Sequence, residues 1–330
     1  EHYRIKADYY NNIRTLLTIH NLEFQGNFDE HESRLFNHDF DGTYIHFNRV
    51  NFLKAGISRA TKINTVSPSF RNEVLTQEKG FSLDGMLRYR EKDFSGILNG
   101  IDDSVFNPDI DPYLVQTYNE KNLVSGKKAN KKALFKDFDF GEDKQLFTYI
   151  GRLSSQKGIH FFQHMLEDFI SHADVKIFLM GSGNTYYEKF FDYLVSKYPD
   201  KVRVYIGFNE QLAHQVYAAS DFFMMPSAYE PCGLGQMIAM RYGALPIVHE
   251  TGGLKDTVIP YNQYTTEGTG FSFNNYDASV FKELLFSASS LYIEKQAVIN
   301  KLKRQAMKSR FTLDQMANHY IALYTSILED

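Results

Sequence analysis

Three short loops in the second half of the chain combine charged side chains with glycines. Arg152 and Lys157 lie in GRLSSQKG, Glu230 precedes two glycines in SAYEPCGLGQ, and HETGGLKDT carries a glycine pair. Glycines ahead of a helix let a ligand approach the backbone closely, and a helix N-terminus favours an anion. Two cations beside such backbone predict a clamp for a diphosphate group. The alternative for the two cations alone is a pair of solvated surface charges.

The elements around these loops place them at one edge of a sheet. Each loop follows a short apolar segment, at residues 145–150, 221–226 and 244–249. From Gln145 onward, such segments alternate with helical patterns of about 10–15 residues, which predicts parallel strands in a doubly wound α/β domain. The pattern of residues 159–172 predicts a helix with Phe162, Leu166 and Phe169 on one face. Ligands bind such sheets at the carboxyl ends of the strands.

The first half of the chain has a less regular pattern. Residues 13–20 predict a buried strand, residues 46–60 a helix, and residues 62–67 a strand that ends before Pro68. A polar, lysine-rich stretch over residues 116–144 gives no clear element. The last 50 or so residues predict helices only.

Composition restricts the class of protein. The 330 residues are 43% apolar and 23% charged, which is typical of a globular protein with a large core. The net charge of -4 argues against nucleic acid as the main partner. No apolar run reaches the roughly 18 residues of a membrane span, and a single cysteine, Cys232, suits a reducing cytoplasm. The opening residues resemble mid-domain sequence, so we interpret the chain as a fragment.

Six segments together resemble a known family. They are TIHNLEFQG, FLKAGISRATKINTVSPSF, GILNGID, GRLSSQKG, SAYEPCGLGQ and TGGLKDTV, and they follow the family's order over most of the chain. The chain resembles the bacterial glycogen synthase and plant starch synthase family of retaining glycosyltransferases. The resemblance implies transfer of glucose from ADP-glucose to the non-reducing end of an α-1,4-glucan such as glycogen, with no metal or other cofactor. It also implies a cytoplasmic enzyme without a nucleic-acid or membrane partner.

The resemblance also implies the GT-B fold, in which two Rossmann-like α/β domains face a cleft. Residues 1–97 would be the remaining part of the acceptor-side domain, and residues 98–311 the nucleotide-sugar-binding domain. Residues 312–330 would form a helix that packs back on the first domain. The family's Lys-x-Gly-Gly-Leu loop is absent, so we expect this chain to be inactive alone and to self-associate through its incomplete domain.

Catalytic roles follow from the resemblance, residue by residue. Arg152 and Lys157 match the pair that holds the diphosphate, where negative charge grows as the glycosidic bond breaks. Glu230 matches the carboxylate that holds hydroxyls of the donor glucose. His20 matches a histidine that contacts the transferred sugar, although a histidine that ends a strand is often structural.

Substrate-binding roles are assigned in the same way. Asn99 matches a cleft asparagine, and Phe208 matches an aromatic residue that stacks on adenine, with a core phenylalanine as the alternative. Cys232 is expected to line the cleft and not to act as a nucleophile. The remaining expected backbone and lining positions are Gly233, Leu234, Gly235, Thr251, Gly252, Gly253 and Leu254.

Two further points limit the assignment. Many GT-B enzymes have a second glutamate eight positions after the first, and here that position is Ile238.

The acidic triplets at residues 109–111 and 137–139 are interpreted as solvated charge and not as metal ligands. A sucrose- or trehalose-forming transferase, or a non-catalytic glucan-binding module, stays open as an alternative.

Overall fold

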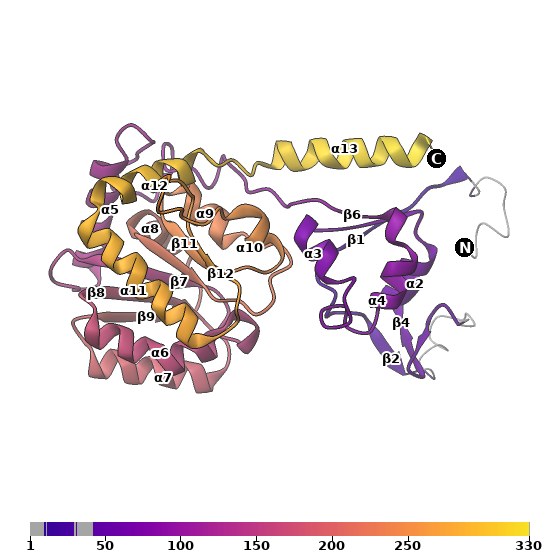
Figure 1. Cartoon of the computed structure of the whole chain (residues 1–330), viewed down its shortest axis with the longest axis horizontal. Coiled ribbons are helices and arrows are strands. Elements are labelled where there is room, and N and C mark those ends of the chain that lie inside the picture. Colours follow the sequence, from indigo (N-terminus) through magenta and orange to yellow (C-terminus); the bar gives the residue numbers. More distant parts are fainter. Residues whose placement is uncertain (1–9, 11, 30, 32–41, 330) are drawn as a thin grey trace. The chain divides into compact units, whose positions relative to one another are not determined.

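The computed structural model describes residues 10, 12–29, 31 and 42–329, which form two compact units (Figure 1). Unit 1 comprises the residues up to Asn99 together with the C-terminal segment from Asp314. Unit 2 comprises Gly100–Leu313.

Unit 1 contains a parallel sheet and a small antiparallel sheet. The parallel sheet has the order β1-β5-β6, with β1 (Leu16–Ile19), β5 (Lys62–Thr65) and β6 (Phe94–Gly96). The antiparallel sheet has the order β2-β4-β3, with β2 (Asn27–Asp29), β4 (Arg49–Asn51) and β3 (Ile45–His46). Strand β1 was predicted as buried, but only Ile19 of its four residues is buried. Its position at the edge of the sheet explains the difference.

The helices of unit 1 are short apart from the last one. They are α2 (Phe52–Arg59), α3 (Pro68–Glu73), α4 (Asp84–Tyr89), η3 (Glu91–Asp93) and α13 (Leu313–Glu329). The predicted helix over residues 46–60 was too long, because Asn51 ends β4 in an extended conformation and caps α2. Its Oδ1 accepts a hydrogen bond from the backbone N–H of Lys54 at 2.7 Å. The side chain of Asn64 donates a hydrogen bond to the Tyr320 hydroxyl of α13 at 3.0 Å.

Unit 2 is built on a six-stranded parallel sheet with the order β12-β11-β10-β7-β8-β9. The strands are β7 (Gln145–Ile150), β8 (Val175–Gly181), β9 (Val202–Ile206), β10 (Phe222–Met225), β11 (Leu245–His249) and β12 (Phe271–Phe273). The chain runs outward from β7 to β9, then returns to the other side of β7 and continues from β10 to β12. Neighbouring strands β7 and β10 therefore form the topological switch point. The prediction of a doubly wound α/β domain is confirmed.

Helices surround this sheet. They are α5 (Leu123–Asp137), η4 (Ser155–Lys157), α6 (Ile159–His172), α7 (Thr185–Lys197), α8 (Glu210–Ala219), α9 (Gly235–Arg241), α10 (Gly252–Thr257), α11 (Ala278–Glu294) and α12 (Gln296–Lys308). Helix α6 packs with α7 and α11, whereas α5 and α12 pack with α8 and α9, and the sheet lies between the two groups (Figure 1). Phe162, Leu166 and Phe169 are fully buried, as the helical pattern predicted. No helix among the described residues combines the length and the apolarity of a membrane span.

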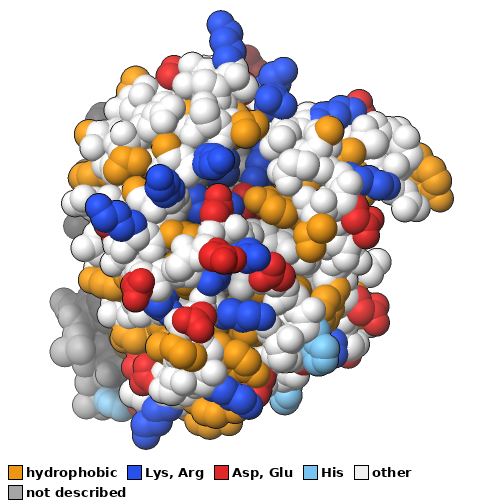
Figure 2. All heavy atoms as spheres, turned by 90° about the vertical axis from the view of Figure 1, so that its left-hand side faces the viewer, with side chains coloured by type: hydrophobic (Ala, Val, Ile, Leu, Met, Phe, Trp, Pro, Cys, Tyr) orange, Lys and Arg blue, Asp and Glu red, His pale blue; other side chains and the backbone are white. Residues whose placement is uncertain are grey.

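Helix α5 was missed in the sequence because the middle of its buried face is polar. Lys127, Asn130 and Lys131 are all buried there, and a lysine is rarely buried unless it has partners. A lysine-rich pattern therefore indicated a solvated stretch. On the face shown in Figure 2, basic side chains lie among acidic and hydrophobic ones, so this face carries no continuous field of one charge.

The interpretation of both acidic triplets as solvated charge was wrong for Asp111. Its side chain is fully buried and accepts hydrogen bonds from His214 Nδ1 at 2.8 Å and from the Tyr242 hydroxyl at 2.5 Å. Burial alone would raise the pKa of Asp111, but these hydrogen bonds outweigh it and lower the pKa. The structure describes no group of three or more His, Cys, Asp or Glu side chains that could hold a metal ion.

Candidate functional site

The loops that follow β7 and β10 meet beyond the switch point. The backbone N–H of Ala228 donates to the carbonyl of Gln156 at 2.9 Å, and Gln156 Nε2 donates to the carbonyl of Tyr229 at 3.3 Å. These two hydrogen bonds tie residues 151–158 to residues 226–234. The predicted charged residues Arg152, Lys157 and Glu230 are thereby brought to the position where open α/β sheets bind ligands.

Lys157 and Glu230 form the central ion pair of the site. Lys157 Nζ lies 2.5 Å from Glu230 Oε2, and the side chains are 19% and 8% exposed. Ser227, which the sequence analysis missed, donates its hydroxyl to the same oxygen at 3.0 Å. No described residue bonds to Glu230 Oε1. The carboxylate is therefore fixed by one oxygen and has the other available for a ligand hydroxyl.

Arg152 supplies a second cation at the same edge. Its side chain is exposed, and Nη2 donates to Gln156 Oε1 at 3.1 Å. No carboxylate in the described part of the chain pairs with it, so its charge has no counterion there. The Tyr149 hydroxyl donates to the Arg152 carbonyl at 2.7 Å, and burial raises the pKa of Tyr149, which keeps this hydroxyl protonated.

The glycine pair of the third loop supports the Glu230 segment directly. Gly252 has φ of +46°, and a Cβ atom there would lie 2.0 Å from the carbonyl oxygen of Glu230. A Cβ at Gly253 would lie 2.1 Å from the carbonyl oxygen of Cys232, and the Gly253 N–H donates to the Glu230 carbonyl at 3.2 Å. Side chains at these two positions would therefore displace the Glu230 loop. Thr251 and Leu254 on either side are fully buried.

The turn between Glu230 and α9 is held by Gln236, a buried residue that the sequence analysis missed. Its Nε2 atom lies 3.1 Å from each of three acceptors, which share its two hydrogens and are the carbonyls of Cys232 and Gly233 and the hydroxyl of Thr257. A glutamine in the first turn of an otherwise apolar helix was the available signal. Helix α9 begins at Gly235 without a side-chain cap, and the preceding Leu234 is 46% exposed.

The remaining predicted residues divide between the two units. Phe208 follows β9 and is 75% exposed, so the alternative of a core phenylalanine is wrong. Cys232 is buried. His20 is exposed directly after β1, and the half-buried Asn99 is the last residue of this part of unit 1. The structure thus gathers the predicted residues of unit 2 at one sheet edge, while His20 and Asn99 belong to unit 1.

Comparison with protein families gives two matches along the chain. Residues 1–89 match the model of the starch synthase catalytic domain, and residues 130–305 match the model of glycosyl transferases group 1. Glycogen synthase of Acholeplasma laidlawii is 59% identical over 99% of this chain and 69% of its own length. Glycogen synthase of Clostridium kluyveri is 43% identical over 98% of this chain and 69% of its own length.

Solved structures agree with these matches. The catalytic domain of starch synthase IV from Arabidopsis thaliana, bound to ADP and acarbose, superimposes with a TM-score of 0.88 at 34% identity, over 96% of this chain and 67% of that one. Anabaena HepE, in complex with UDP and glucose, has a TM-score of 0.63 at 17% identity, over 97% of this chain and 73% of that one, a likeness of fold alone. The chain has the GT-B fold and belongs to the glycogen synthase and starch synthase family of glycosyltransferases.

Proposed function

We propose that the protein transfers glucose from ADP-glucose to the non-reducing end of an α-1,4-glucan, with retention of configuration. The observation that carries this proposal is the unpaired Arg152 beside the Lys157–Glu230 pair at the switch point. The names of the relatives support the reaction class. The ADP and acarbose in the starch synthase IV structure support an adenine nucleotide and a glucan-like acceptor.

In the proposed reaction, the bond between glucose C1 and the diphosphate oxygen breaks, and its electron pair stays on the diphosphate. The 4-hydroxyl of the acceptor forms the new bond to C1 on the same face. Its proton passes to an oxygen of the leaving diphosphate. Arg152 and Lys157 stabilise the charge that develops on the diphosphate, which is the kind of interaction that lowers a transition state most.

Glu230 is proposed to position the donor glucose. Its Oε2 atom is held by Lys157 and Ser227, so Oε1 can accept a hydrogen bond from a sugar hydroxyl without loss of an existing contact. Phe208 is proposed to stack on adenine, because an aromatic face exposed beside a sheet edge suits a base. The backbone N–H groups of Leu234 and Gly235 are proposed to contact the distal phosphate. The roles of His20 and Asn99 rest on the resemblance alone.

The complete protein that contains this sequence should be incubated with glycogen and with radiolabelled ADP-glucose or UDP-glucose, with and without EDTA. We expect glucose incorporation from ADP-glucose that is insensitive to EDTA, since Arg152 and Lys157 supply the positive charge. A Lys157→Ala variant should lose most of this glucose incorporation. Lys189→Ala, which changes an exposed lysine on α7, should retain it.

Other outcomes would change the proposal in defined ways. A preference for UDP-glucose would overturn the choice of donor. Inhibition by EDTA would overturn the metal-independent mechanism. Glycogen binding without incorporation from either donor would favour the non-catalytic glucan-binding alternative.

A further inference from the structure

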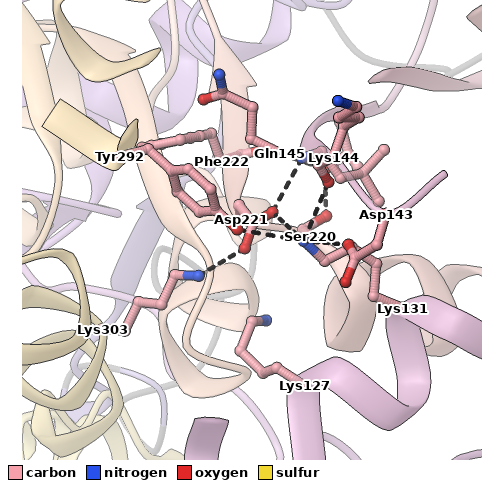
Figure 3. A network of polar contacts seen from close by, with 12 residues as sticks. Lys127, Lys131, Asp143, Lys144, Gln145, Ser220, Asp221, Phe222, Tyr292 and Lys303 are labelled. Carbon is pink, nitrogen blue, oxygen red and sulfur yellow. Dashed lines mark hydrogen bonds and ion pairs between the residues drawn. The ribbon is translucent and has the colours of Figure 1, made fainter. Parts of the chain in front are cut away.

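A second lysine–carboxylate cluster lies at the opposite end of the same strands, and nothing in the proposed reaction uses it. Asp221 directly precedes β10, and a cavity of about 200 Å³ opens beside it between α5 and α12. In Figure 3, lysines approach Asp221 from several sides. The charged side chains that line the cavity are Lys127, Lys128, Lys131, Asp143, Asp221 and Lys303.

Asp221 is fully engaged by its neighbours. Its Oδ2 atom accepts hydrogen bonds from Lys131 Nζ at 2.7 Å and from the backbone N–H of Leu146 at 2.9 Å. Its Oδ1 atom accepts a hydrogen bond from Lys303 Nζ at 2.6 Å. One negative charge is therefore shared between two buried ammonium groups.

Lys127 has no carboxylate partner among the described residues. Its ammonium group donates to the carbonyls of Ala218 and Tyr242, each at 2.9 Å, which lie at the C-terminal ends of α8 and α9. Helix C-termini carry only partial negative charge. Burial, followed by repulsion from Lys303, lowers the pKa of Lys127 well below its ordinary value.

The cavity therefore has an excess of positive charge. Even without Lys127, whose pKa is lowered, three lysines line it against two carboxylates, and one of these, Asp143, is 49% exposed. Among the described residues, Asp221 is the only hydrogen-bond acceptor of Lys303, whose ammonium group also lies 5.5 Å from the centroid of the Tyr292 ring. Buried charge without full compensation is costly, and a bound anion would reduce that cost.

Other features of the wall also suit an anion. Val124 in the first turn of α5 and Gln296 in the first turn of α12 line the cavity, and neither helix has a side-chain cap. Helix N-termini carry partial positive charge. The volume corresponds to about seven water molecules at roughly 30 Å³ each, which is room for a phosphate group with some of its hydration water.

We propose that this cavity binds a small phosphate-like oxyanion, either inorganic phosphate or the phosphate group of a small metabolite. The lysine side chains supply the charge, and Gln296 and Asn300 add polar groups at the wall. The site is separate from the candidate active site, since Asp221 and Glu230 flank opposite ends of β10. It does not depend on the proposed catalytic function.

The test is calorimetric titration with inorganic phosphate at constant ionic strength, with chloride as the balancing ion. An Arg152→Ala/Lys157→Ala background removes binding at the diphosphate clamp. We expect saturable binding that weakens about threefold in Lys128→Gln, the effect of one exposed ion pair. Lys303→Met should weaken it about tenfold, the effect of one charge-assisted hydrogen bond. Lys132→Gln, an exposed α5 lysine outside the cavity wall, is the matched control and should bind like the background.

Titrations with glucose 6-phosphate and with sulfate identify the source of the oxyanion. Tighter binding of the sugar phosphate than of phosphate would indicate a metabolite, and equal binding of phosphate and sulfate would indicate the free ion. Absence of saturable binding would overturn the proposal. So would equal affinities in the Lys128→Gln and Lys132→Gln variants, a comparison that does not depend on the folding of Lys303→Met.

Discussion

The two ends of strand β10 carry similar chemistry in different surroundings. Asp221 precedes the strand and Glu230 follows it, and each pairs with lysine. Both oxygens of Asp221 are occupied, by two buried lysines and a backbone N–H. Glu230 uses only Oε2 and lies near the exposed, unpaired Arg152. The comparison shows what makes an ion pair a candidate active site. A carboxylate oxygen or a neighbouring cation must be left without a protein partner, so that it can bind a ligand.

The Asp221 end has a structural consequence. Its carboxylate connects β7 through Leu146, α5 through Lys131 and α12 through Lys303, although these residues are far apart in sequence. Removal of the negative charge would leave two buried cations facing each other. Breaking a buried ion pair costs more than an exposed one, because the remaining charge is uncompensated.

The largest expected effect is therefore on stability. Asp221→Asn should lower the free energy of unfolding by about 3–5 kcal/mol, the range for a broken buried pair. Chemical denaturation followed by circular dichroism measures it. Asp143→Asn, which removes the half-exposed carboxylate of the same cluster, should cost about 1 kcal/mol or less. Equal losses in the two variants would contradict the difference in burial on which this prediction rests.

The stability lost in Asp221→Asn has a predictable pH dependence. Burial by itself would raise the pKa of Asp221, but Lys131 and Lys303 outweigh burial and lower it far below the ordinary value. A lowered carboxyl pKa stabilises the fold above the unfolded-state pKa of about 3.9, and this stabilisation is lost as pH falls through the folded-state pKa. The stability difference between the wild type and Asp221→Asn should therefore be constant near neutral pH and narrow below about pH 4. A difference that widened in acid would contradict the assignment.

At the Glu230 end, the expected loss is in catalysis. Lys157→Ala and Arg152→Ala should each lower kcat by roughly 10²–10³, as for loss of one group that stabilises transition-state charge. Glycogen affinity should change little in both variants. The melting temperature should change little in Arg152→Ala, whose side chain is exposed, but should fall in Lys157→Ala, because the nearly buried Glu230 loses its cation. Steady-state kinetics with varied ADP-glucose measures the effect. Turnover within about threefold of the wild type in both variants would contradict the clamp.

These two ends also differ in how far the sequence could predict them. The loops with Arg152, Lys157 and Glu230 were predictable, because each follows a recognisable strand and parallel strands share an edge. Ser227, three residues before Glu230, could have been found in the same way. The Asp221 cluster could not, because its partners Lys131 and Lys303 lie 90 and 82 residues away in the sequence.

A smaller effect is expected at Phe208. Its ring is 75% exposed, and loss of one aromatic stacking contact with a base costs about 1–3 kcal/mol. Phe208→Ala should therefore weaken ADP binding by roughly 5- to 150-fold, while Phe208→Tyr should retain most of it. Calorimetry with ADP measures both variants. Unchanged ADP affinity in Phe208→Ala would exclude the stacking role.

The smallest effect is expected at Cys232, although it lies two residues from Glu230. Its backbone carbonyl accepts a hydrogen bond from Gln236 Nε2 at 3.1 Å and lies where a Cβ atom at Gly253 would clash. Cys232→Ser leaves this carbonyl in place, so turnover should stay within about threefold, the effect of less than 1 kcal/mol.

Gly253→Ala is the contrasting variant. It places a Cβ atom 2.1 Å from the Cys232 carbonyl oxygen, and it should impair turnover far more than Cys232→Ser. Parallel kinetic measurements on the two variants separate a requirement for the thiol from a requirement for the loop. Loss of turnover in Cys232→Ser with intact ADP binding would assign chemistry to the thiol. A larger loss of turnover in Gly253→Ala than in Cys232→Ser would indicate that the loop holds Glu230 through its backbone.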